Sequence, residues 1–323
     1  MNLLIGNRRE LSDRYLGSCA TAQDKLDVGR LWSPTCARLR DAAQFARTPF
    51  DVEQASVQKL RVANLELDWI DASAAGPLVR TVRLDDLGVS PMSYCGKRAA
   101  FLHSGCAEVA DLLEDELAFI SEFTSAIVWL GSDREDTNFG NSSFYLAPHI
   151  TFMSDGSLFF ISPMRQIPRE YGAYGFIENL FHESLHHQVH AHCAFTQTNY
   201  CVPGIDAFRE LLDFPCRTDR TFTLFQAINA CHVYAAVTPL RMRVHAALVR
   251  RAGGHDDGQL DWLLHGARDS LQMWLEFSQA LSMVGHKLLP VWRALVQEWA
   301  DEAQSFSNRS PELRAQGRVP LAA

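Results

Sequence analysis

The alternation of apolar and polar residues along the chain predicts a mainly helical protein. Apolar residues recur at three- and four-residue intervals in CATAQDKLDVGRLW and in FDVEQASVQKLRVANLELDWI, which is typical of helices that bury one face. Residues 1–85 are therefore expected to form an N-terminal helical region. The same spacing predicts a long helix over residues 221–251 and further helix over residues 260–304, bent near Pro290.

Two stretches in the middle of the chain have the pattern of β-strands. AIVWLGSD is apolar and ends at a Gly-Ser-Asp turn signal. In ITFMSDGSLFFISP, two apolar runs flank Asp155-Gly156, a dipeptide that favours tight turns, so a hairpin of residues 150–153 with 158–161 is expected. A helix over residues 176–195 follows. The predicted fold class is mainly α (α+β): a helical domain with a small antiparallel β-hairpin or sheet next to that helix.

The strongest chemical signal is a histidine cluster on the helix that follows the hairpin. Five of the chain's twelve histidines lie in FHESLHHQVHAH, residues 181–192, and HESLH within it is an HExxH motif. Residues four apart share one face of a helix, so the rings of His182 and His186 can reach one metal ion. Glu183 points about a quarter-turn aside, where its carboxylate can contact a metal-bound water.

Further histidines on the helix leave a second pairing open. His190 continues the register of His182 and His186, so the pair His186 and His190 is a rival pair of ligands. His187 points away from this face of the helix. A catalytic site needs a third protein ligand and free coordination positions besides the two histidines.

Three residues are candidates for the third ligand. Glu210 lies 24 positions after His186, in the predicted short helix DAFRELLDF, and Asp213 lies one turn further along. The arrangement with Glu210 is similar to that of metallopeptidases whose third ligand is a glutamate on a following helix. His232 lies in the apolar segment FQAINACHVYAAV, where a buried imidazole needs a polar partner.

Two segments, FIENLFHESLHHQ and CRTDRTFTLFQAINACHVYAAV, together resemble a known family. Its members carry an HExxH domain, occur with ribosomally made peptide natural products, and are regarded as 2-oxoglutarate-dependent, iron-using peptide β-hydroxylases. In that family a connector rich in arginine and aspartate precedes an apolar helix with one histidine. Here Arg217 and Arg220 match the connector and His232 matches the histidine. The resemblance spans roughly residues 108–249 and is one of pattern; Cys216 stands where the family commonly has tryptophan.

The resemblance implies an iron(II) site with 2-oxoglutarate as co-substrate. His182, His186 and His232 would be the metal ligands, leaving three coordination positions for 2-oxoglutarate and oxygen. The far carboxylate of 2-oxoglutarate would be bound by the guanidinium group of Arg220 or Arg217, whose two-pronged geometry suits a carboxylate. The substrate implied is a ribosomally synthesised precursor peptide.

The role of Glu183 differs between the interpretations. In the oxygenase, Glu183 accepts a hydrogen bond from a metal ligand. In the alternative, a zinc metallopeptidase of the HExxH type, Glu183 is the general base and Glu210 is the third ligand. Both interpretations expect a peptide along a groove beside the hairpin, and a non-catalytic module that keeps its metal for structure is a third. Ser142, Ser143 and Tyr145 are expected to line the site.

Charge and the ends of the chain limit the class of protein further. The net charge is -8 with no block of like charge and no basic stripe, so no nucleic-acid partner is expected. No apolar run is long enough for a membrane span, and the N-terminus does not have the pattern of a signal peptide, so a cytoplasmic protein is expected. The predicted domains are an N-terminal helical region (1–85), a metal-binding catalytic domain (86–305) and a flexible tail (306–323).

Overall fold

The structure is a computed structural model of the chain, and it is mainly helical with some β-structure, as predicted. The chain divides into two compact units, Asn2–Gln197 and Thr198–Ala323, which are described separately. None of the described helices is both long enough and apolar enough to cross a membrane. For Thr81 and residues 191–196 only the backbone is described. The described residues are 57–132, 140–144, 147, 149–163, 165–196, 200–212, 221–254 and 258–313.

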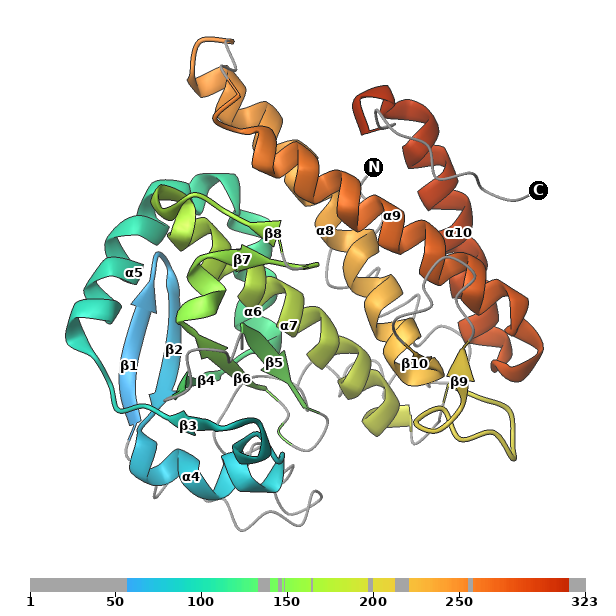
Figure 1. Cartoon of the computed structure of the whole chain (residues 1–323), viewed down its shortest axis with the longest axis horizontal. Helices are drawn as coiled ribbons and strands as arrows, with labels where there is room; N and C mark the ends of the chain where they lie inside the picture. The colour runs from blue at the N-terminus through green and yellow to red at the C-terminus, as the bar shows by residue number, and fades with distance from the viewer. Residues whose placement is uncertain are drawn as a thin grey trace, which may run out of the picture. The chain divides into compact units, whose positions relative to one another are not determined.

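A mixed sheet forms the centre of the first unit, as Figure 1 shows. Its strand order is β1-β2-β4-β6-β5, with β3 also paired to β4. The pairs β2–β4 and β4–β6 are parallel and the other pairs are antiparallel, so the sheet is larger than the predicted hairpin. In chain order the strands are β1 (Val57–Val62), β2 (Leu65–Ile70), β3 (Val89–Pro91), β4 (Ala126–Ser132), β5 (Asn141–Ser143) and β6 (Ile150–Ser154).

The helix predicted for FDVEQASVQKLRVANLELDWI is wrong over residues 57–70. These residues form the antiparallel hairpin β1–β2, which turns at Ala63, a residue with a φ of 53°. In β1 the buried Leu60 and Val62 alternate with exposed residues, whereas β2 is buried at every position except Glu66, and the spacing of apolar residues over the two strands together resembles that of a helix. Because β2 pairs with β4, this part of the predicted N-terminal region belongs to the same sheet as residues 126–154.

The predicted hairpin over residues 150–161 is also wrong. Its first strand, β6, pairs with β4 and β5 instead. The Asp-Gly pair lies in a short 3₁₀ turn, η3 (Asp155–Leu158), and the Ser154 hydroxyl caps its first turn. The second apolar run gives β7 (Phe160–Ile161), which pairs with β8 (Arg165–Gln166). Antiparallel pairs therefore do lie next to the HExxH helix, since β5, β6 and β7 all contact it.

Helices cover both faces of this sheet. On one face, Leu78 of α4 packs in a cluster with Val128 and Phe152 from the central strands. On the other face, Phe176 of α7 stacks on Trp129 of β4, with ring centroids 6.0 Å apart. The α7 helix is thereby fixed on the sheet. The helices and short 3₁₀ turns of this unit are α4 (Ala72–Thr81), η1 (Asp85–Leu87), α5 (Gly96–Val109), η2 (Ala110–Leu112), α6 (Glu114–Phe123), η4 (Arg169–Tyr171) and α7 (Gly172–Thr196).

The close approach of α5 to α7 depends on a glycine. A Cβ atom at Gly105 would lie 2.8 Å from the Cβ atom of Ala173, and neither atom can move without its helix. We expect Gly105→Ala to lower the free energy of unfolding by about 1–3 kcal/mol, measured by urea denaturation, although alanine favours helix more than glycine does. Gly96→Ala, at a position with open space, is the control and should not destabilise the protein.

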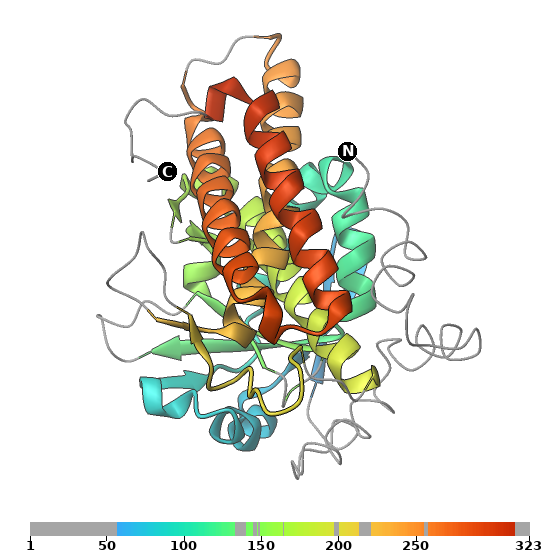
Figure 2. The ribbon, with the colours of Figure 1, turned by 90° about the vertical axis from the view of Figure 1, so that its right-hand side faces the viewer.

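The second unit is built from three consecutive helices that pack side by side, as Figure 2 shows. The first of these helices begins at a capping box, in which Thr223 Oγ1 accepts a hydrogen bond from the backbone N–H of Gln226 at 3.2 Å. The predicted long helices are confirmed, and the expected bend near Pro290 is a break, since Pro290 begins a new helix. The elements are β9 (Leu211–Leu212), β10 (Phe222–Thr223), α8 (Leu224–Arg251), α9 (Asp261–Met283), η5 (Gly285–Lys287), α10 (Pro290–Arg309) and η6 (Pro311–Leu313).

Candidate metal centre

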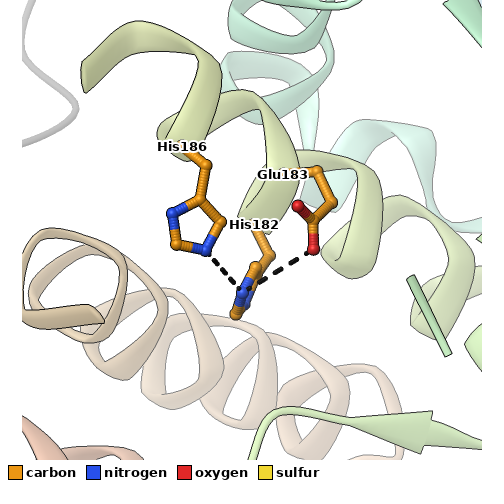
Figure 3. A group of neighbouring side chains, drawn as sticks. All are labelled: His182, Glu183 and His186. Carbon is orange, nitrogen blue, oxygen red and sulfur yellow. Dashed lines mark hydrogen bonds and ion pairs between the residues drawn. The ribbon is translucent and has the colours of Figure 1, made fainter. Parts of the chain in front are cut away.

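The structure brings the two motif histidines together on α7. The Nε2 atoms of His182 and His186 lie 3.2 Å apart and point toward each other, as Figure 3 shows. With metal–nitrogen bonds of about 2.1 Å, this separation corresponds to a nitrogen–metal–nitrogen angle of about 100°, which suits tetrahedral and octahedral sites alike. With the Glu183 carboxylate, all the ligand atoms lie within 4.8 Å of one another. The donors present therefore fit a divalent transition-metal ion.

The rival pair has a less suitable geometry. The rings of His186 and His190 are nearly parallel, with centroids 6.4 Å apart, whereas those of His182 and His186 are 5.0 Å apart. This geometry favours His182 and His186 as the ligands. Burial, and secondarily the neighbouring His186, lowers the pKa of His190 to about 3.

His187 faces the core of the first unit rather than the metal centre. Its side chain is buried, and its Nε2 lies 3.4 Å from the Thr151 hydroxyl of β6. Burial and then the neighbouring His149 hold the pKa of His187 well below its ordinary value, so the ring is neutral. His187 therefore helps to orient α7 on the sheet and cannot share an ion with His182.

The α7 helix is held in place by a polar contact outside the helix and by its buried apolar residues. The Ser184 hydroxyl lies 2.7 Å from the Thr124 hydroxyl and donates to the carbonyl of Leu180 at 2.8 Å. An apolar stripe along α7 is buried, so rotation of the helix would expose a large apolar area. The stripe consists of Phe176, Ile177, Leu180, Phe181, Leu185 and Val189, each at most 1 % exposed.

The Glu183 carboxylate is held by two residues of the edge strand β5. Its Oε1 accepts a hydrogen bond from Asn141 Nδ2 at 2.6 Å, and its Oε2 accepts one from Ser143 Oγ at 2.5 Å. Oε1 also lies 3.9 Å from the Nε2 atom of His182. That nitrogen is the one that faces His186, so Glu183 is directed toward the position of the ion and not toward the outer nitrogen of a ligand ring.

Of the residues predicted to line the site, the structure places one beside the motif. Ser143 contacts Glu183, whereas Ser142 points to the opposite face because side chains alternate along a strand. Tyr145 lies outside the described residues. Asn141 was missed by sequence reasoning; recognition of NSS as a strand would have indicated it, since Asn141 and Ser143 then share a face.

Burial is the main influence on the protonation of Glu183. The side chain is almost completely enclosed, and desolvation raises the pKa of its carboxyl group above the ordinary 4.5. His186 and the hydrogen bonds from Ser143 and Asn141 act in the opposite direction, because each favours the charged form. A metal ion bound by the two histidines would favour the charged form as well.

The raised pKa predicts how the metal-free protein responds to Glu183→Gln. Between the ordinary pKa and the higher folded pKa the unfolded state binds fewer protons, so the stability of the wild type falls as pH rises through this window. We expect the variant to have a higher melting temperature than the wild type at pH 8, and this advantage to shrink toward pH 4. Calorimetry in the presence of a chelator measures it, and an advantage independent of pH would contradict it.

His232 lies in the second unit, in the middle of α8. The side chain is 1 % exposed, and its ring lies 5.8 Å from that of Trp299 on α10. The prediction that His232 is buried in an apolar helix is therefore confirmed. The assignment of His232 as a ligand beside His182 and His186 stays a prediction.

Glu210, the third ligand of the peptidase alternative, has a different local structure from the one expected. The predicted helix DAFRELLDF is not formed: Asp206 begins a turn, and Glu210 directly precedes the strand β9. The Glu210 carboxylate accepts a hydrogen bond from the Lys287 ammonium group in an ion pair. A metal ion at Glu210 would have to compete with this cation. Three predicted residues lie outside the described part of the chain: Asp213, Arg217 and Arg220.

Comparisons with known proteins do not assign this chain to a family. No protein-family model matches it, and no curated protein matches it. The resemblance to the peptide β-hydroxylases accordingly rests on the two sequence segments that carry it.

Proposed function

We propose that this protein is a non-haem iron(II)- and 2-oxoglutarate-dependent oxygenase that hydroxylates the β-carbon of a residue in a ribosomally synthesised peptide. The observation that carries the proposal is the pair of facing Nε2 atoms, 3.2 Å apart, on a helix packed against the sheet, with a carboxylate directed to the same place. The resemblance of the residues 108–249 to such hydroxylases supports the choice of reaction.

The chain's own residues have separate tasks in this proposal. His182, His186 and His232 hold the ion and leave coordination positions free. Arg220 or Arg217 binds the far carboxylate of 2-oxoglutarate. When bound, iron and 2-oxoglutarate supply the oxidation: one atom of O₂ enters a C–H bond, and the other enters succinate as CO₂ is released.

Glu183 orients groups near the ion in this proposal. Because Asn141 and Ser143 each donate to one of its oxygens, the carboxylate has little freedom to rotate. Its remaining lone pairs accept a hydrogen bond from water or from the peptide. The carboxylate therefore sets the direction from which the substrate approaches.

The zinc peptidase is the second candidate, and one observation favours it. Burial raises the pKa of Glu183, which suits a general base that takes a proton from water. Against it stands the ion pair of Glu210 with Lys287, which occupies the carboxylate that this alternative needs as its third ligand. We therefore place the oxygenase first.

The deciding experiment is a mass measurement. The protein is incubated with iron(II), ascorbate, 2-oxoglutarate and a precursor peptide encoded next to its gene. We expect the peptide to gain one oxygen atom and succinate to form in equal amount. Under argon, iron(II) with 2-oxoglutarate should give a visible charge-transfer absorption. Tight binding of zinc, with cleavage of the peptide and no such absorption, would support the peptidase instead.

A further inference from the structure

The strand that holds Glu183 lies at the end of the sheet. In the strand order β1-β2-β4-β6-β5, β5 pairs with β6 on one side, and the described residues provide no neighbour on the other. Its sequence, Asn-Ser-Ser, has neither proline nor a charged residue, two of the features that keep an edge strand from pairing. Within the part of the chain that the structure describes, the backbone of β5 is thus a candidate to pair with another short strand.

The register shows which backbone groups face this edge. The N–H of Ser154 donates to the carbonyl of Gly140 at 2.9 Å, so these opposite residues form a hydrogen-bonded pair. Hydrogen-bonded and non-hydrogen-bonded pairs alternate in an antiparallel ladder. Ser142 opposite Phe152 is then hydrogen-bonded, and Asn141 and Ser143 are not. The backbone N–H and C=O groups of Asn141 and Ser143 therefore point away from β6, toward the edge.

The same two residues contact the metal centre. The side chains of Asn141 and Ser143 donate to Glu183, whose Oε1 lies 3.9 Å from the Nε2 of His182. A strand added to β5 would lie about 4.8 Å beyond it. Every second side chain of that strand would point to the face on which α7 carries Glu183 and His182.

We propose that the substrate peptide binds in an extended conformation as an added strand on the edge of β5, and that this binding presents one of its side chains to the metal centre. The proposal rests on the proposed function in taking a peptide as the substrate. It adds the conformation and the place of binding. Backbone hydrogen bonds to Asn141 and Ser143 supply affinity without regard to sequence, so the specificity comes from alternate side chains.

The test uses the full chain and peptides selected from a phage-displayed library of random dodecapeptides, in the presence of a chelator. Each selected peptide is then synthesised with a single N-methyl group at every position in turn, and its Kd is measured by fluorescence anisotropy. We expect two alternating classes: methylation of an N–H that faces β5 raises Kd about tenfold, and methylation of the intervening residues has little effect. Failure to select any peptide, or a Kd profile without this period of two, would overturn the proposal.

Hydrogen exchange gives a second measurement on the protein itself. On peptide binding, the amides of Asn141 and Ser143 should become protected, whereas the amide of Ser142, already paired with β6, should change little. Ser142→Ala, on the opposite face of the strand, should bind the peptide as the wild type does. These measurements need no iron, so they test the binding mode whether or not the protein is an oxygenase. Hydroxylation of the peptide without the alternating Kd profile would refute the binding mode and leave the proposed function standing.

Discussion

Replacing His182 or His186 by alanine is expected to weaken the binding of a divalent metal ion by more than about a hundredfold, since even residues that only support a ligand contribute ten- to a hundredfold. The two Nε2 atoms face each other at 3.2 Å, so each variant removes one of two bonds at the same ion. Titration calorimetry with cobalt(II), and metal analysis after dialysis, measure the loss. Both side chains are partly exposed, so the variants should still fold.

Two further histidines provide the controls for this prediction. His103 is exposed on α5, and His103→Ala should bind metal as the wild type does. His190 belongs to the rival pair, and we expect His190→Ala to retain the ion as well. If His190→Ala lost the metal and His182→Ala kept it, the ligands would be His186 and His190, and the site geometry described above would not be the functional one.

His232→Ala is expected to remove the visible absorption of the iron(II) and 2-oxoglutarate complex and to weaken iron binding by about a hundredfold or more. Glu210→Gln should leave both unchanged, because its carboxylate is engaged with Lys287. The opposite result, with metal lost on Glu210→Gln and kept on His232→Ala, would replace the oxygenase by the zinc peptidase. Anaerobic absorption spectroscopy and titration with iron(II) distinguish these outcomes.

His232 is also part of the core of the second unit, so a loss of folding has to be separated from a loss of a ligand. The alanine variant removes a ring that lies 5.8 Å from that of Trp299. Added imidazole can fill the resulting space and supply a nitrogen donor. Restoration of the absorption by imidazole would identify His232 as a ligand, whereas a variant that melts like the wild type and binds iron normally would exclude it.

The local spacing of apolar residues predicted the long helices well. The helix α7 was expected over residues 176–195 and spans Gly172–Thr196, because its buried stripe repeats every three to four residues. The helix α8 was expected over residues 221–251 and spans Leu224–Arg251 for the same reason. An α-helix satisfies its hydrogen bonds within its own segment, so a local signal is sufficient to identify it.

The strands were predicted less well because their hydrogen bonds join distant segments. The apolar residues of β1 and β2 were taken for a helix, since a two-strand pattern interrupted by a turn approaches helical spacing. The Asp155-Gly156 turn was recognised, but β6 pairs with β4 and β5 rather than with the run that follows the turn. Nothing in a single strand's sequence specifies which neighbour it will have.

The sequence alone determined that two imidazoles share a face, because four residues are close to one turn of any α-helix, whatever surrounds it. Only the tertiary structure decided which residues hold the carboxylate of Glu183 in place. Asn141 and Glu183 are 42 positions apart, and they meet because β5 lies at the edge of the sheet on which α7 is packed. Contacts of this kind depend on strand order and register, which arise from long-range pairing and are not specified by the local pattern of one segment.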